Sequence, residues 1–213
     1  MNRLEIEYRS PEWLKFRQTG IGGSDASSIF GLNPYKSNVE LWEEKTGIKE
    51  PKQVSNNESA EYGLKAEEYL LKLFQLDFPD YEVSAPKDTV YQNGFMFASL
   101  DGEIKDKKTG EMGILEIKTT SILSSMHREK WNDKIPDNYY IQILHYLAVT
   151  GYSFAILKAQ LKYTDGEFPY LKTIHRIIKR EEVKDDIEFL ISEEKKFWQC
   201  VVDKKRPPLK LNL

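Results

Sequence analysis

The sequence predicts an α/β fold of the α+β kind, in which a central mixed β-sheet is flanked by helices. Helical and extended patterns follow one another as helices, a group of strands, a helix, two strands and a final helix. This order favours a layered fold in which helices cover a mixed sheet. The 213 residues can bury one sizeable core, and we therefore expect a single domain over 1–213.

Short helices separated by glycine-rich turns are expected in the first quarter of the chain. Pro11 can open the first helix, and Ser24 or Asp25 can cap a second helix after the glycines of TGIGGSD. A third, amphipathic helix is predicted over 38–47. The polar segment 48–59 has a turn-forming composition, and we expect it to be a mobile loop.

The rest of the chain contains the strands and three longer helices. Apolar residues at helical spacing predict a helix over 59–77, with an apolar side formed by Leu64, Leu70, Leu71 and Phe74. Further helices are predicted at about 137–150, ended by Gly151, and at about 180–201. The expected strands are 81–84, 88–92, 96–104, 112–119, 153–163 and 169–178.

Charge and composition exclude several classes of protein. The formal net charge of −3 excludes a protein that binds nucleic acid through overall positive charge, although it leaves room for a local basic channel. No signal segment and no membrane-spanning apolar run is present, so we expect a cytoplasmic protein. The one cysteine, Cys200, is expected to be a packed thiol in a reducing compartment.

The segment FASLDGEIKDKKTGEMGILEIKTTS, 97–121, carries charges that a core strand would not need. Side chains alternate along a strand, so Glu116 and Lys118 share one face, and pairing of neighbouring strands would bring Asp101 near Glu116. Two adjacent carboxylates favour a hard cation such as Mg²⁺ between them. The pattern predicts metal-assisted phosphodiester hydrolysis, with Lys118 orienting water or stabilising phosphate charge. An exposed hairpin face is the alternative.

Two polar residues on predicted helices are further candidates. Glu67 lies beside the apolar side of its helix and therefore needs a partner, which makes it a possible third acidic group. Alternatively, it is a boundary residue whose carboxylate reaches solvent. Gln142 lies in the middle of its helix, one turn from Tyr139 and His145. Its amide could bind a metal-ligated water or a phosphate, or hold only a neighbouring main chain.

Five motifs occur in order between residues 17 and 152. They are RQTGIGGSDASSIFGLNPYKSNVELWEEKTG, YGLKAEE, ASLDGEI, LEIKTTS and WNDKIPDNYYIQILHYLAVTGY. Together they make the chain similar to the YqaJ-type viral recombinase family, which resembles phage lambda exonuclease and belongs to the PD-(D/E)xK nuclease superfamily. The resemblance implies that superfamily's fold, a central mixed sheet with helices on both sides.

The resemblance also implies roles for the charged residues. Asp101 and Glu116 would ligate Mg²⁺ or Mn²⁺, with the carbonyl of Ile117 as a further ligand and Glu67 beside the metals. Lys118 would be the catalytic lysine that positions the attacking water.

Two residues of the first motif match family positions that hold the 5′-phosphate of the DNA end. These are Arg17 and Ser24, and a guanidinium with a hydroxyl and glycine-flanked N–H groups suits an anion. Without the resemblance, the preferred explanations are a surface salt bridge for Arg17 and a plain N-cap for Ser24. Leu100 replaces the proline of the family motif, and Leu144 replaces a second glutamine, which bears on rate or processivity rather than on the chemistry.

The function implied is a Mg²⁺-dependent 5′-to-3′ exonuclease on linear double-stranded DNA, producing 3′ single strands for phage-type homologous recombination. The implied partners are DNA with a 5′-phosphate end, a single-strand annealing protein, and copies of the chain in a ring-shaped trimer. The lining of such a ring would draw on Arg9, Lys15, Lys105, Lys107, Lys108, Lys130 and Lys134. A structure- or site-specific endonuclease and a non-catalytic DNA-end-binding module are the alternatives.

Overall fold

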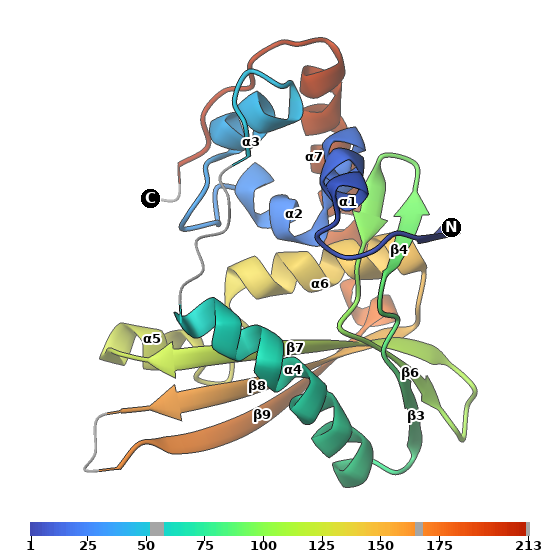
Figure 1. Cartoon of the computed structure of the whole chain (residues 1–213), viewed down its shortest axis with the longest axis vertical. Helices are drawn as coiled ribbons and strands as arrows, with labels where there is room; N and C mark the ends of the chain where they lie inside the picture. The colour runs from blue at the N-terminus through green and yellow to red at the C-terminus, as the bar shows by residue number, and fades with distance from the viewer. Residues whose placement is uncertain (52–57, 165–167, 212–213) are drawn as a thin grey trace.

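A computed structural model describes residues 1–51, 58–164 and 168–211 and contains two mixed sheets with helices around them (Figure 1). The larger sheet has the strand order β3-β6-β7-β8-β9. Its strands are β3 Tyr81–Ser84, β6 Gly102–Asp106, β7 Met112–Ile122, β8 Phe154–Tyr163 and β9 Tyr170–Lys179. Only the β7–β8 pair is parallel in this sheet. The predicted α/β class with a mixed sheet is confirmed.

A second, four-stranded sheet was not expected. Its order is β1-β4-β5-β2. The strands are β1 Asn2–Glu5, β2 Ile21–Gly22, β4 Thr89–Asn93 and β5 Met96–Ala98. Strands β1 and β2 are four and two residues long, too short to show an alternating pattern in the sequence.

The prediction of one continuous strand over 96–104 is wrong. The chain leaves β5 after Ala98 and enters β6 of the other sheet at Gly102. Between them, the side chain of Asp101 accepts a hydrogen bond from the main-chain N–H of Ile117 at 2.8 Å. This side chain satisfies a donor of β7 that the main chain of a longer β6 would otherwise satisfy. A local side-chain contact therefore ends the strand.

The helices are mostly those predicted. They are α1 Pro11–Phe16, α2 Gly23–Ile29, α3 Asn38–Lys45, α4 Glu58–Asp77, α5 Ser125–Lys130, α6 Asp137–Thr150 and α7 Lys184–Val202. The short helix α5 was expected to be loop, and α7 begins late because Arg180–Val183 form a 3-10 turn. Half of the loop expected at 48–59, residues 52–57, lies outside the described residues, and residues 58 and 59 belong to α4.

Helices cover both faces of the larger sheet. Leu115 and Ile117 of β7 pack against Leu70 and Phe74 of α4, which lies across the strands in Figure 1. The opposite face belongs to the core that contains Ile143 and the rest of the apolar side of α6. Glu116 and Lys118 alternate with the α4-facing residues and so point to the α6 side.

One residue of the predicted apolar side of α4 is misplaced. Leu64 is 42% exposed, whereas Leu70 and Phe74 are buried. The first turns of α4 extend past the core that covers its C-terminal half. In the described part of the chain, no helix is both long enough and apolar enough to cross a membrane.

Candidate active site

Asp101, Glu116 and Lys118 meet where β6 begins beside β7. Glu116 is fully buried, and its Oε1 accepts a hydrogen bond from the ammonium group of Lys118. Its second oxygen, Oε2, is buried and has no hydrogen-bond partner among the described residues. A buried carboxylate oxygen without a partner is costly, so this atom marks a position for a donor or a cation.

The carboxylates of the site raise one another's pKa. Burial and the charge of Asp101 raise the pKa of Glu116 to about 8. Burial and Asp101 likewise raise the pKa of Glu67, on α4, to about 7. Burial also raises the pKa of Asp101. The site therefore concentrates more negative charge than its surroundings stabilise, which is the electrostatic condition that favours a bound cation.

Lys118 opposes this charge from within the site. Burial alone would lower the pKa of its ammonium group, but Glu116 and Asp101 outweigh burial and raise it. The ammonium group also lies 5.4 Å from the centre of the Tyr139 ring. Lys118 is thus held as a cation beside the candidate ligands.

The donor set fits a hard divalent ion. Within residues 1–51, 58–164 and 168–211, no three His, Cys, Asp or Glu side chains are grouped closely enough to hold a metal. Two carboxylates, Asp101 and Glu116, nevertheless lie together beside the main chain of Ile117, and both offer oxygen atoms. Oxygen donors suit Mg²⁺ or Mn²⁺.

Gln142 reaches this site through a residue that the sequence reasoning missed. Its Nε2 donates a hydrogen bond to the Tyr146 hydroxyl at 2.8 Å. Burial first, and then the charge of Glu116, raise the pKa of Tyr146. A Cβ on Gly23 would lie only 2.3 Å from the Tyr146 ring, so a glycine allows α2 to approach α6 here. The spacing of Gln142 and Tyr146, one helical turn, was the available signal.

The predicted pair Arg17 and Ser24 is in direct contact. Arg17 Nη2 donates to Ser24 Oγ at 3.2 Å and to Asp25 Oδ1 at 2.9 Å. The guanidinium lies over the Trp13 ring, 5.0 Å from its centre. Ser24 is not the N-cap, because Gly22 holds that position. The Ser24 hydroxyl is therefore available at the surface beside a guanidinium.

A buried ion pair that the sequence reasoning missed supports Arg17. Asp25 is 3% exposed, and its Oδ2 accepts from Lys45 Nζ at 2.7 Å. Lys45 Nζ also donates to the carbonyl oxygen of Arg17 at 2.6 Å. Burial alone would raise the pKa of Asp25, but Lys45 and Arg17 hold it well below its ordinary value. Two cations and one carboxylate leave one net positive charge, which suits an anion.

His145 is a packed histidine. It is fully buried, and its Nδ1 and Nε2 lie 2.8 Å from Glu194 Oε1 and 2.9 Å from the Phe97 carbonyl oxygen. A carbonyl oxygen only accepts, so Nε2 carries hydrogen and donates to Phe97, while Nδ1 pairs with the Glu194 carboxyl group. His145 joins α6, α7 and β5 and does not contact the carboxylate site.

Two solved structures that share this fold are described as exonucleases. An alkaline exonuclease from Laribacter hongkongensis superposes with a TM-score of 0.63 at 17% identity, covering 92% of this chain and 94% of that one. A phage-related exonuclease from Haemophilus somnus 129PT has a TM-score of 0.59 at 15% identity, covering 90% and 99%. The fold and the carboxylate pair thus define a protein of the nuclease fold.

The family follows from the sequence itself. The model of the YqaJ-like viral recombinase domain matches residues 12–153, and the chain belongs to this family. The uncharacterized protein YqaJ of Bacillus subtilis is 34% identical over 197 residues, which are 90% of this chain and 56% of that protein. Protein D345L of African swine fever virus is 45% identical over 42 residues, 20% of this chain and 12% of that protein. The chain spans little more than half of the first relative.

Proposed function

We propose that the protein is a divalent-metal-dependent exonuclease that digests linear double-stranded DNA from 5′ to 3′ and leaves 3′ single strands. The observation that carries the proposal is the unpartnered Oε2 of buried Glu116, beside Asp101 and the Lys118 ammonium group. The proposal that the protein is an exonuclease is also supported by its membership of a viral recombinase family and by a fold shared with exonucleases.

The roles of the site residues follow from their chemistry. Asp101, Glu116 and the Ile117 carbonyl would hold Mg²⁺ or Mn²⁺, with Glu67 at the edge of the site. When bound, the ion would supply Lewis acidity and a water of lowered pKa. Lys118, held as a cation beside Glu116, would orient the attacking water and stabilise the charge that grows on the scissile phosphate.

Three residues outside the carboxylate site, Gln142, Arg17 and Ser24, would position the substrate. Gln142 fixes the Tyr146 hydroxyl, which faces the charge of Glu116, and so shapes the wall of the site. Arg17 and Ser24 would bind the 5′-phosphate of the DNA end, with the surplus positive charge supplied by the Arg17–Asp25–Lys45 cluster. Recognition of that phosphate would set the direction of digestion.

The wider assembly is also part of the proposal. A protein that prepares 3′ single strands for phage-type recombination would act in the cytoplasm and would work with a single-strand annealing protein. A ring-shaped homotrimer would place the exposed basic side chains of several copies around the duplex. This would reconcile DNA binding with the net charge of −3.

A single substitution tests the chemistry. Glu116→Gln keeps the shape of the side chain but removes its charge, and we expect cleavage of a linear duplex in Mg²⁺ to fall by at least about 100-fold. Glu68→Gln is the matched control, since Glu68 lies on the surface of α4 and pairs with Lys72 at 2.8 Å. Circular dichroism would verify that both variants are folded. A folded Glu116→Gln protein that cuts at the wild-type rate would contradict the assignment.

A further inference from the structure

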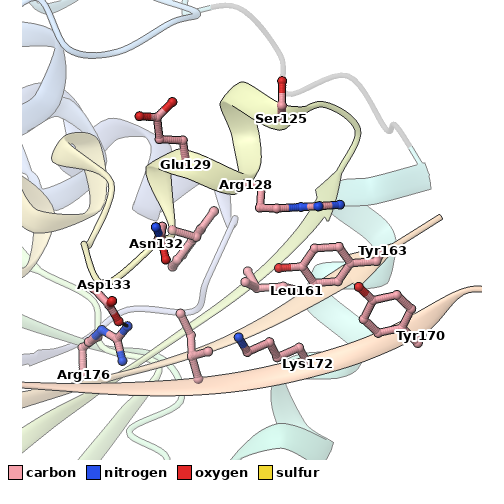
Figure 2. A pocket seen from close by; sticks show the side chains of 12 residues that line it. Ser125, Arg128, Glu129, Asn132, Asp133, Leu161, Tyr163, Tyr170, Lys172 and Arg176 are labelled. Carbon is pink, nitrogen blue, oxygen red and sulfur yellow. Dashed lines mark hydrogen bonds and ion pairs between the residues drawn. The ribbon is translucent and has the colours of Figure 1, made fainter. Parts of the chain in front are cut away.

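A pocket of about 560 Å³ lies between α5 and the strands β8 and β9 (Figure 2). Side chains of both the helix and the sheet line it, and none of them belongs to the candidate active site. The lining residues are Ser125, Arg128, Glu129, Trp131, Asn132, Asp133, Leu161, Tyr163, Tyr170, Lys172, Ile174 and Arg176.

The pocket opens on the same sheet face as the carboxylate site. Strand register places Lys118 opposite Ala159, and Ala159 opposite Ile174, so these three side chains lie in one row across the sheet. The next row on this face passes through Leu161 and Lys172, which line the pocket. The pocket therefore continues the active-site face of the sheet in the direction of β9.

Two aromatic rings separate the pocket from Lys118. The Tyr139 ring lies 5.4 Å from Lys118 Nζ on one side and 5.6 Å from the Trp131 ring on the other. Trp131 lines the pocket. A flexible chain that passes the active site could thus reach the pocket across the Tyr139 and Trp131 rings.

The chemistry of the pocket combines aromatic surface with positive charge. Tyr163 and Tyr170 are stacked, with ring centres 4.7 Å apart and planes 3° apart, and Arg128 lies 5.5 Å from the Tyr163 ring centre. Tyr170 is 52% exposed, so one of its faces can receive another ring. Figure 2 shows the Lys172 amine directed into the space between α5 and the sheet.

Charged side chains of both signs line the pocket. Among the described residues these are Arg128, Lys172 and Arg176 with Glu129 and Asp133. Arg176 is paired with Asp133 at 3.4 Å. Lys172 forms no ion pair within the part of the chain that the structure describes, and its amine is free for an anion.

We propose that this pocket binds a nucleotide, with the base stacked on Tyr170 and the phosphate held by Lys172. Aromatic surface beside a cation is the combination that binds nucleotides without regard to sequence. The nucleotide would be either a unit of the unpaired strand that leaves the active site or a released mononucleotide. This inference rests on the proposed nuclease function, which supplies both.

Binding of single-stranded DNA without divalent metal tests the inference. The probe is a fluorescein-labelled ten-nucleotide oligodeoxynucleotide, followed by fluorescence anisotropy. We expect Lys172→Ala and Tyr170→Ala each to weaken binding by at least about fivefold. Lys179→Ala is the control, since Lys179 lies at the other end of β9, outside this pocket, and is 66% exposed. Competition by dAMP that is lost in the same variants would identify a mononucleotide as the occupant.

The outcomes separate this inference from the function on which it rests. Loss of oligonucleotide affinity without a dAMP effect would support the unpaired strand as the occupant. If Lys172→Ala and Tyr170→Ala bind the oligonucleotide as tightly as a wild-type protein that cleaves DNA, the pocket does not bind a nucleotide. The proposed nuclease function would not be affected by that result. A folded wild-type protein that cleaves no DNA would overturn the nuclease itself.

Discussion

Asp101 accepts a hydrogen bond from the main-chain N–H of Ile117, with 2.8 Å between Oδ2 and N. This contact lies directly before β6, where the chain passes from one sheet to the other, and fixes a carboxylate beside Glu116. Asp101 therefore both interrupts the strand between β5 and β6 and supplies a candidate metal ligand. Leu100, the residue before Asp101, is buried, and the contact forms without a proline at this position.

Arg17 is predicted to give the enzyme its preference for phosphorylated ends. Arg17→Ala removes the guanidinium that contacts Ser24, and we expect the ratio of cleavage rates on 5′-phosphorylated and 5′-hydroxyl ends to fall about 10-fold or more. Paired duplexes that differ only in this phosphate would measure the ratio. Lys15→Ala, an exposed residue of the same helix segment, is the control. An unchanged ratio in Arg17→Ala would remove Arg17 from the phosphate site.

The buried Asp25–Lys45 pair is predicted to be a stability determinant. Asp25→Asn leaves the ammonium of Lys45 buried without its counter-charge, and we expect the free energy of unfolding to fall by about 3–5 kcal/mol. Urea denaturation would measure this. The double variant Asp25→Asn with Lys45→Met removes the stranded charge and should recover part of the loss. A single variant as stable as wild type would show that the pair is dispensable.

His145 is predicted to make stability depend on pH. Burial alone would lower its pKa, but Glu194, the Phe97 carbonyl and Asp25 outweigh burial and raise it. Protonated His145 therefore stabilises the folded state, and this contribution is complete below the pKa of an unfolded histidine, about 6.5. The contribution is lost as the pH rises through the higher pKa of His145 in the folded state.

The comparison with a neutral side chain isolates this effect. His145→Gln should be less stable than wild type at pH 6, and the difference in free energy of unfolding should shrink as pH rises. His127→Gln, on exposed helix α5, is the control for replacing a histidine far from Glu194. A difference that stays constant or grows with pH would mean that His145 is not held as the imidazolium.

Much of the fold was predictable because its longer elements carry strong periodicity. Helix α4 begins one residue before its predicted start, and α6 ends at Gly151, which has φ of +72°. Strands β1 and β2 were not predictable, since two to four residues carry no periodic signal. The break before β6 depends on the hydrogen bond between Ile117 and Asp101, which are 16 residues apart in the sequence. A local sequence pattern does not predict such a contact.

Part of the candidate site was predictable from the sequence, namely the carboxylate pair, whereas the buried ion pair was not. The meeting of Asp101 with Glu116 followed from strand pairing and side-chain alternation. Asp25 and Lys45 lie 20 residues apart in different helices, and each would be an ordinary polar residue on its own helix. Their contact arises from the packing of α2 against α3, which single-sequence patterns do not specify.

The most direct test of the central claim is the digestion of one linear duplex in Mg²⁺, with one 5′ end phosphorylated and the other not, beside a covalently closed circle of the same sequence. The account predicts nucleotide release from the phosphorylated end and an intact circle. Cutting of the circle would contradict an end-dependent exonuclease and favour an endonuclease. No cleavage of either substrate, in Mg²⁺ or Mn²⁺, would contradict the nuclease assignment and favour a DNA-end-binding module.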